Sequence, residues 1–137
     1  MATAGVRIDW IKAGESKKPG TIIIPFAKAA NQEKTMAEAK VFEGTNIKLF
    51  IDRILPHATK DDAWRVLSHV MAHEITHILQ ATDTHARTGI MKAQWGSSDF
   101  GSMLFKPLSF ESGDIELIQR GMEKRQAANN TVLASAK

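Results

Sequence analysis

The chain has 137 residues, of which 43% are hydrophobic and 24% charged, and a formal net charge of +3 at pH 7. This length and composition are typical of one globular domain with a single core, and they exclude collagen-like, low-complexity and disordered chains. The chain has no cysteine, which excludes disulfides, thiolate metal ligands and a cysteine nucleophile. Any metal ion must therefore be bound by His, Asp or Glu.

Charge and hydropathy also limit the partners. The lysines of the N-terminal half are scattered and form no basic stripe with interleaved aromatic residues, so we expect no nucleic-acid partner. No apolar run approaches the roughly 20 residues of a membrane span, and the first residues lack the features of a signal peptide. We expect a soluble monomer without a membrane partner. The compartment stays open, because a secreted chain whose signal segment has been removed has the same features.

The N-terminal part predicts short strands joined by turns. Val6–Ile11 is expected to form a strand, and residues 14–20, with paired lysines and a proline, a loop. Thr21–Pro25 is a β-branched run that predicts a short buried strand, which Pro25 ends because proline has no N–H group. These segments indicate a small sheet near the start of the chain.

Two further segments belong to the predicted sheet. Residues 26–41 fit either a helix or, over Met36–Phe42, an edge strand, and hydrophobic periodicity does not decide between them. Asn46–Leu55 alternates apolar and polar residues and predicts a strand that Pro56 ends. One of these segments is expected to be an edge strand that lines a cleft and holds an extended peptide by main-chain hydrogen bonds.

The clearest predicted element is a helix over Thr59–Gln80. Thr59–Asp62 resembles a capping box, in which the threonine hydroxyl binds free backbone amides at the start of the helix. One apolar face follows the helical period: Trp64, Leu67, Met71, Ile75 and Ile78. A second face combines valines with histidines: Val66, Val70, His73 and His77. We therefore expect this helix to be covered on both sides.

The C-terminal part predicts a loop followed by a last helix. Residues 81–101 are rich in Thr, Gly and Ser without a long period, which predicts an ordered loop, and a bound metal ion would explain its order. A last helix is expected from Ser112 to about Ala128, followed by a flexible tail over residues 129–137. Neither a repeat nor a linker is evident, so residues 1–137 are expected to form a single α/β (α+β) domain.

The segment His73-Glu74-Ile75-Thr76-His77 carries the candidate chemistry. One helical turn places His73 and His77 about 40° apart on one face, so that both imidazoles can reach one ion. Glu74 is rotated by about 100° from His73, which places its carboxylate beside the ion as a general base and not as a ligand. A catalytic zinc needs a third protein ligand and one open position. Asp83 and His85, both after the helix, are the candidates for this ligand.

The stretch His69–Trp95 resembles the zincin metallopeptidases, and more narrowly the metzincins. In short bacterial domains of this kind, HExxH is followed after seven residues by a histidine and then by a Gly-Ile/Val-Met turn. This order matches His85 and Met91, so the resemblance favours His85 over Asp83 as third ligand and implies a methionine turn at Met91 beneath the metal ion. The sequence departs from many relatives at Thr76 and Gln80, where those relatives have glycine.

The resemblance implies a zincin-like fold, in which a small mixed sheet packs on the active-site helix and a C-terminal helix follows. It also implies a zinc metalloendopeptidase that hydrolyses a peptide or protein substrate, with Zn²⁺ as cofactor and Glu74 as general base and later general acid. Two alternatives remain open: a zinc-binding interaction module without activity, and a zinc amidase that acts on a non-peptide substrate.

Ordinary structural roles are expected for the other histidines and for the tryptophans. His69 is expected to pack or to support a ligand without binding the metal ion, and His57 to be a solvated loop residue. Trp10, Trp64 and Trp95 are expected in the core, with Trp95 also close enough in sequence to the methionine turn to border a cleft.

Overall fold

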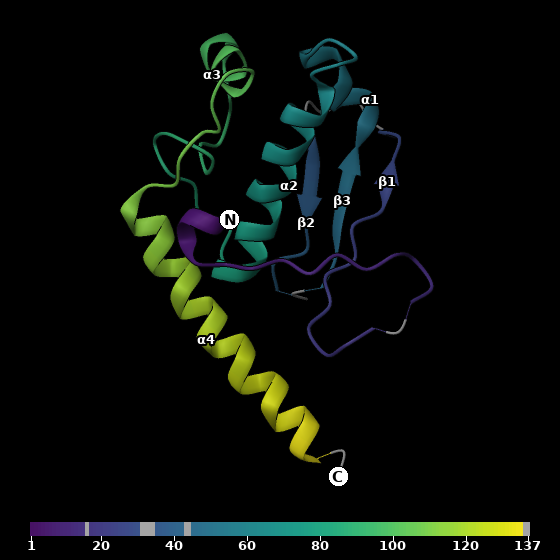
Figure 1. The fold of residues 1–137 in the computed structure, drawn as a ribbon, viewed down its shortest axis with the longest axis vertical. Helices are drawn as coiled ribbons and strands as arrows, with labels where there is room; N and C mark the ends of the chain where they lie inside the picture. The colour runs from purple at the N-terminus through teal and green to yellow at the C-terminus, as the bar shows by residue number, and fades with distance from the viewer. Residues whose placement is uncertain (16, 31–34, 43–44, 136–137) are drawn as a thin grey trace.

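The computed structural model describes residues 1–15, 17–30, 35–42 and 45–135, and it has a mixed α/β architecture (Figure 1). The elements in chain order are η1 Ala2–Ala4, β1 Phe26–Ala27, β2 Ala37–Ala39, β3 Ile47–Phe50, α1 Ile51–Ile54, η2 Leu55–His57, α2 Ala63–Gln80, α3 Ser97–Met103 and α4 Ser112–Ser135. A small mixed sheet, a long central helix and a C-terminal helix are all present, which confirms the predicted α+β class. No helix in the described part of the chain combines the length and apolarity needed to cross a membrane.

The sheet places β3 in the centre, with β1 parallel to it on one side and β2 antiparallel to it on the other. On β3 the side chains of Ile47 and Leu49 are buried, whereas Lys48 between them is exposed. Helix α2 packs against both β2 and β3, so the buried side chains of the sheet face this helix. The strand β2 is therefore an edge strand, as one of the two interpretations of Met36–Phe42 predicted.

Of three strand predictions, the first is wrong and the other two are wrong in part. Val6–Ile11 forms no strand, and Ile11 is exposed, because no neighbouring strand covers this run. The parallel edge of the sheet does not end at Pro25: the carbonyl of Pro25 accepts a hydrogen bond from Leu49, and β1 follows directly. Asn46–Leu55 remains a strand only as far as Phe50, after which the chain enters α1.

Helix α2 begins at Ala63, four residues later than predicted. The hydroxyl of Thr59 donates to the Asp62 carboxylate at 3.1 Å and caps no backbone amide of the helix. The two ends of the 59–62 segment are joined by a hydrogen bond from Asp62 N to Thr59 O, so this segment is a turn before the helix. The prediction that both faces of the helix are covered holds for Val66 and Val70 on one face and for Ile75 and Ile78 on the other, all of them buried, but not for Trp64, which is exposed.

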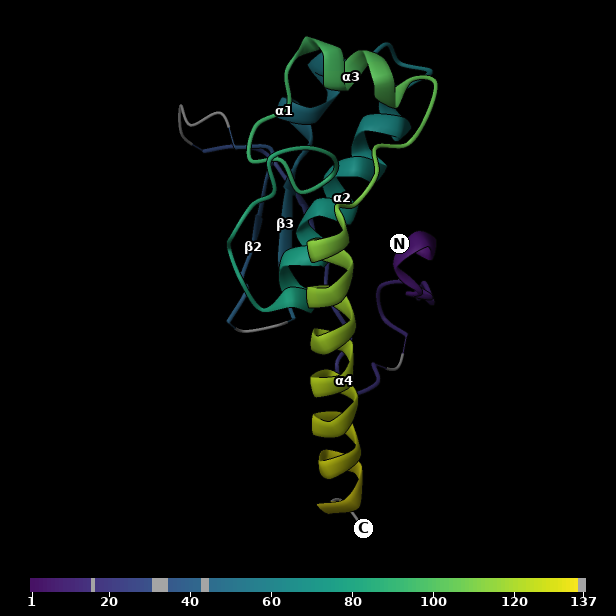
Figure 2. The same cartoon turned by 90° about the vertical axis from the view of Figure 1, so that its left-hand side faces the viewer.

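Helix α4 crosses the C-terminal end of α2 at close range. A Cβ atom on Gly121 would collide with the carbonyl of Leu79, so only glycine permits this approach. The side-chain amide of Gln80 donates through Nε2 to the Asp114 backbone carbonyl at 3.1 Å and joins the same two helices. Beyond this crossing, α4 contacts the N-terminal segment, where the Arg125 guanidinium donates to the Gly20 carbonyl at 2.7 Å, and its C-terminal end extends away from the sheet (Figures 1 and 2).

The C-terminal boundaries also differ from the predictions. Helix α3 occupies part of the segment 81–101, which was expected to be a loop. Gly96 is the residue before this helix, and its backbone N–H donates to the Asp99 carboxylate at 2.8 Å. Helix α4 continues to Ser135 and does not end near Ala128, so most of the predicted tail is helical. Residues 136–137 of that tail lie outside the described residues.

Candidate metal centre

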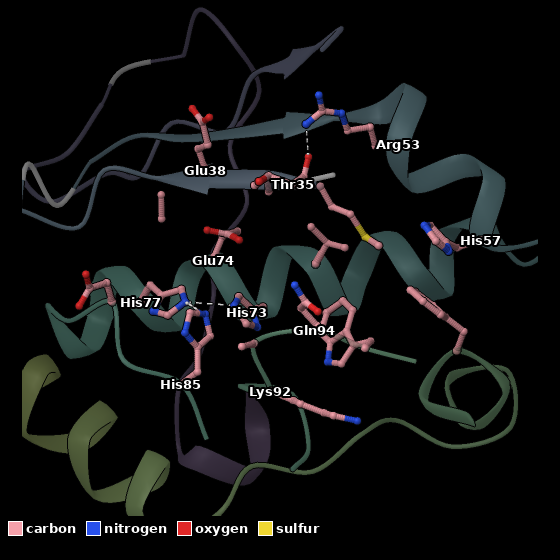
Figure 3. A pocket seen from close by; sticks show the side chains of 18 of the residues that line it. Thr35, Glu38, Arg53, His57, His73, Glu74, His77, His85, Lys92 and Gln94 are labelled. Carbon is pink, nitrogen blue, oxygen red and sulfur yellow. Dashed lines mark hydrogen bonds between the residues drawn. The ribbon is translucent and has the colours of Figure 1, made fainter. Parts of the chain in front are cut away.

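Three histidine side chains meet on one side of α2. Helix α2 carries His73 and His77 one turn apart, and their Nε2 atoms lie 3.0 Å from each other. His85, from the loop that follows the helix, brings its Nε2 to 3.3 Å from that of His77. The ligand atoms of the three residues all lie within 4.8 Å of one another, which is close enough for one metal ion (Figure 3).

Backbone carbonyls orient the two histidines of α2. His73 Nδ1 lies 2.7 Å from the carbonyl of Ile90, and His77 Nδ1 lies 2.8 Å from the carbonyl of Thr82. A carbonyl oxygen can only accept, so each Nδ1 carries the hydrogen and each neutral ring presents an unprotonated Nε2 to the cluster. Metal-binding histidines commonly have a hydrogen-bonded ring of this kind, because it fixes the tautomer and the ring direction.

Burial keeps these imidazoles neutral. His73 and His77 are only 8% and 5% exposed. The pKa of His73 is lowered to about 4, mainly by burial and also by the neighbouring His77 and His85, while the hydrogen bond to Ile90 opposes the shift. Burial also lowers the pKa of His77. Unprotonated nitrogen lone pairs at 3.0 Å repel one another unless an electrophile lies between them. Since protonation is disfavoured, the donor set fits a metal cation.

The structure brings His85, and not Asp83, into the cluster. Asp83 lies in the same loop and its charge acts on His77, but it is outside the group of ligand atoms that meet. Helix α2 ends when Ala81 adopts the left-handed conformation, with φ of 52°, one residue after Gln80. The chain therefore turns back toward the histidines without a glycine at that point.

The segment predicted as a methionine turn is tightly folded behind His73. Gly89 has φ of 73°, and a Cβ atom there would collide with the carbonyl of Ser109. The backbone N–H of Ile90 donates to that same carbonyl at 2.9 Å, and the Ile90 carbonyl receives the hydrogen bond from His73. Met91 is completely buried in the core. Its place beneath a metal ion stays a prediction.

Glu74 lies between the histidines and the edge strand β2 in Figure 3. The residue is buried, with 8% of its surface exposed. The pKa of Glu74 is raised to about 7, mainly by burial and also by the charge of Glu38 on β2, while a hydrogen bond from the Ala39 backbone amide opposes the rise. A carboxyl group with this pKa can both take up and release a proton near neutral pH.

A cleft of about 970 Å³ contains the whole constellation. Its lining includes β2, the three histidines, Glu74 and Trp95, and His57 lies further along the cleft in Figure 3. The Trp95 ring meets the His73 ring edge-on with centroids 5.6 Å apart, and its Nε1 donates to the Gly89 carbonyl. Trp95 therefore borders the cleft as predicted.

The remaining aromatic predictions have mixed outcomes. His69 is buried and both its nitrogens are used, since Nδ1 donates to the Arg65 carbonyl at 2.7 Å and Nε2 accepts the Leu108 amide at 3.0 Å. Its predicted packing role is confirmed. The prediction of Trp10 and Trp64 in the core is wrong, because they are 65% and 59% exposed, and Arg65 lies over the Trp64 ring.

Several groups of the site were not predicted from the sequence. The carbonyls of Thr82 and Ile90 orient His77 and His73. Every residue has a backbone carbonyl, so the residue types do not indicate which carbonyls take this role. Glu38 acts on Glu74 across the cleft, and the alternation of β2, with Glu38 between two alanines, was the available indication. Glu111 lies 26 positions after His85 in the chain and contacts Thr88 of the loop that carries His85. Local sequence patterns do not detect contacts between segments so far apart.

Comparisons with known proteins identify no similar protein, so a functional proposal depends on the sequence motif and the geometry of the site. No protein-family model, no curated protein and no solved structure matches the chain.

Proposed function

We propose that the chain is a zinc-dependent peptidase. The observation that carries the proposal is that the Nε2 atoms of His73, His77 and His85 converge in a cleft, while the Glu74 carboxyl group lies beside them and faces the same space. The resemblance of His69–Trp95 to the zincin metallopeptidases supports the same function.

The donor set favours zinc among the common metal ions. Three neutral imidazoles suit Zn²⁺, Cu²⁺, Fe²⁺ and Ni²⁺, whereas Mg²⁺ and Ca²⁺ prefer oxygen ligands. Three protein ligands and an open fourth position are typical of catalytic zinc sites, among them those of metallopeptidases. When bound, a zinc ion supplies Lewis-acid polarisation and lowers the pKa of a coordinated water to about 7.

Glu74 is proposed as the group that moves the proton. Its carboxylate accepts a proton from the attacking water, and the resulting carboxylic acid then donates this proton to the leaving amine. Burial and Glu38 hold its pKa at about 7, so neither the protonated nor the ionised form is strongly favoured at neutral pH. The same burial limits access of bulk water to the carboxyl group.

The open edge of β2 is proposed to bind the substrate backbone. Hydrogen bonds from Phe50 N to Met36 O and from Lys40 N to Asn46 O show which residues of this segment pair with β3. Ala37 and Ala39 lie opposite Leu49 and Ile47 in the alternate register, so their main-chain groups face away from β3. The Ala39 amide already donates to Glu74, so the main-chain groups of Ala37 and the Ala39 carbonyl are the ones proposed to bind the substrate. An extended peptide can add to this edge as a further strand, as the sequence predicted.

The test combines metal analysis with a cleavage assay on casein and a peptide library. We expect the purified protein to bind one zinc ion and to cleave peptides. Glu74→Gln is close to isosteric and lies outside the histidine cluster, so it should keep the zinc ion and lose about 10²- to 10⁴-fold in kcat, the range for general acid–base catalysis. Glu116→Gln, on the exposed surface of α4, is the matched control and should retain activity.

Three results would contradict the proposal in different ways. A folded protein that binds no zinc would remove the metal centre. Zinc bound at full occupancy without cleavage of any peptide would favour an interaction module. Cleavage of a non-peptide amide, with peptides left intact, would favour an amidase.

A further inference from the structure

The third histidine is held differently from the other two. The rings of His73 and His77 are each fixed by a carbonyl, whereas among the described residues the only ring-nitrogen contact of His85 is with His77. The His85 side chain is also exposed. Its position must therefore come from the backbone of the loop that carries it.

This loop is closed by its own backbone and by contacts with the segment before α4. The amide of Ala86, next to His85, donates to the Met91 carbonyl at 2.8 Å, which makes residues 86–91 a closed turn. Ile90 N donates to the Ser109 carbonyl at 2.9 Å. Side chains add to these main-chain contacts: Trp95 donates to the Gly89 carbonyl and His73 to the Ile90 carbonyl, while Glu111 binds Thr88, three positions after His85.

Glu111 binds both donors of Thr88. Its Oε1 accepts the Thr88 hydroxyl at 2.6 Å and the Thr88 backbone amide at 2.9 Å. These two hydrogen bonds lower the pKa of Glu111, so its carboxyl group is ionised at neutral pH and acts purely as an acceptor. Charge-assisted hydrogen bonds are stronger and shorter than neutral ones. Because Thr88 makes two of them with Glu111, its orientation is restricted.

Glu111 is in turn fixed to the helices. Its backbone N–H donates to the Asp114 carboxylate at 3.1 Å, and its carbonyl accepts Ile115 N at 3.2 Å, so it begins the first turn of α4. Helix α4 docks on the end of α2 through the close contact at Gly121 and the hydrogen bond from Gln80. Glu111 therefore connects the helix that supplies two histidines with the loop that supplies the third.

We propose that Glu111 is a positioning residue of the metal centre: by holding Thr88, it keeps His85 in place to complete the histidine cluster. The inference rests on the metal centre of the proposed function and is independent of the peptidase reaction. It assigns to α4 the task of joining the two segments that carry ligands.

The test measures Co²⁺ binding in the full chain, by competition with a chromophoric chelator and by the visible spectrum of the bound ion. The variants are Glu111→Ala, which removes the acceptor, Glu111→Gln, whose amide oxygen can accept both hydrogen bonds, and Thr88→Val, which removes only the hydroxyl donor. Glu116→Ala, at an exposed glutamate in the helix that follows Glu111, is the matched control for the loss of charge. Thermal unfolding of each metal-free variant is recorded alongside.

We expect Glu111→Ala to raise the Kd for Co²⁺ about tenfold, the lower end of the range for residues that support metal ligands, and to alter the cobalt spectrum. Glu111→Gln should restore both, Thr88→Val should have an intermediate effect, and Glu116→Ala should have none. Adding Thr88→Val to Glu111→Ala should weaken binding no further, because both changes break the same contact.

Wild-type affinity and spectrum in Glu111→Ala would overturn the inference while leaving the metal centre intact. Equal weakening in Glu116→Ala, or no rescue by Glu111→Gln, would also overturn it, because charge alone would then explain the effect. If Glu111→Ala does not fold, Thr88→Val decides, since an unchanged spectrum and affinity in this variant contradict the inference. A wild type that binds Co²⁺ yet cleaves no peptide would refute only the peptidase proposal.

Discussion

Helix α2 and the loop over residues 82–92 contribute to the same cluster by different physical means. Helix α2 presents His73 and His77 from one buried face, and each ring is fixed by a carbonyl. The loop presents an exposed His85 that depends on distant contacts with Ser109 and Glu111. A helical turn therefore places two histidines of the cluster on one face, with the His73 ring oriented by Ile90 of the loop, whereas His85 depends on contacts with the C-terminal part.

Removal of a ligand is the strongest way to test this comparison. His73→Ala, His77→Ala and His85→Ala should each weaken zinc binding by more than about a hundredfold, because changes in residues that merely support ligands already cost 10- to 100-fold. Isothermal titration calorimetry or chelator competition measures the affinity. Asp83→Ala is the matched control from the same loop and should bind zinc as the wild type does. A loss of zinc in Asp83→Ala with retention in His85→Ala would reverse our choice of third ligand.

A substitution at Gly89 tests the loop alone. Gly89→Ala places a Cβ atom against the Ser109 carbonyl and forces alanine to adopt a positive φ, so we expect a loss on the order of 3 kcal/mol in the free energy of unfolding, with weaker zinc binding. Urea unfolding measures the change. Gly101→Ala in α3 is the control, because a Cβ atom there meets nothing within 4 Å. A Gly89→Ala protein as stable as the wild type would show that the turn can relax.

The pH dependence of the metal-free protein tests the buried face of α2. His73, with its pKa lowered to about 4, stays neutral in the folded state while the unfolded chain binds a proton, so its contribution to stability is lost as the pH falls from 6.5 toward 4. Glu74, with its pKa raised to about 7, holds a proton that the unfolded chain releases, so its contribution is lost as the pH rises from 4.5 to 7. The two effects oppose each other over most of this range.

Substitution separates these two opposing contributions. In Glu74→Gln the free energy of unfolding should fall more steeply with acidification than in the wild type, by up to about 3 kcal/mol between pH 6.5 and 4 if His73 alone titrates. In His73→Ala the slope between pH 7 and 4.5 should shift in the opposite direction. Urea unfolding at several pH values measures both. Identical slopes in the wild type and in both variants would contradict the burial of these groups.

The smallest expected effect is at the junction of the two regions. Ala81 has φ of 52°, a conformation that costs an alanine roughly 1 kcal/mol relative to glycine. Ala81→Gly should therefore raise the melting temperature slightly and leave zinc affinity unchanged, since the backbone already has the required shape. Differential scanning calorimetry measures the change. A lower melting temperature would show that the entropy of the unfolded glycine chain outweighs the relief of strain.

Local sequence patterns predicted the elements in which the spacing of apolar residues matches the period of a helix or a strand. The helix that carries His73 and His77 was predicted because its apolar residues recur at three- and four-residue steps, and the edge strand at Met36–Phe42 was one of two interpretations of its segment. The strand predicted at Val6–Ile11 was wrong because alternation alone supplies no neighbouring strand. The capping role of Thr59 was wrong because its hydroxyl binds Asp62 instead.

The sequence by itself determined that two imidazoles one helical turn apart share a face and that Glu74 lies beside them, because helix geometry depends on nearest neighbours along the chain. Only the tertiary structure decided that His85 reaches this face, that Glu74 is buried against β2, and that Glu111 holds the loop. These contacts join segments far apart in the chain, and they form only where packing of the helices and the sheet brings those segments together.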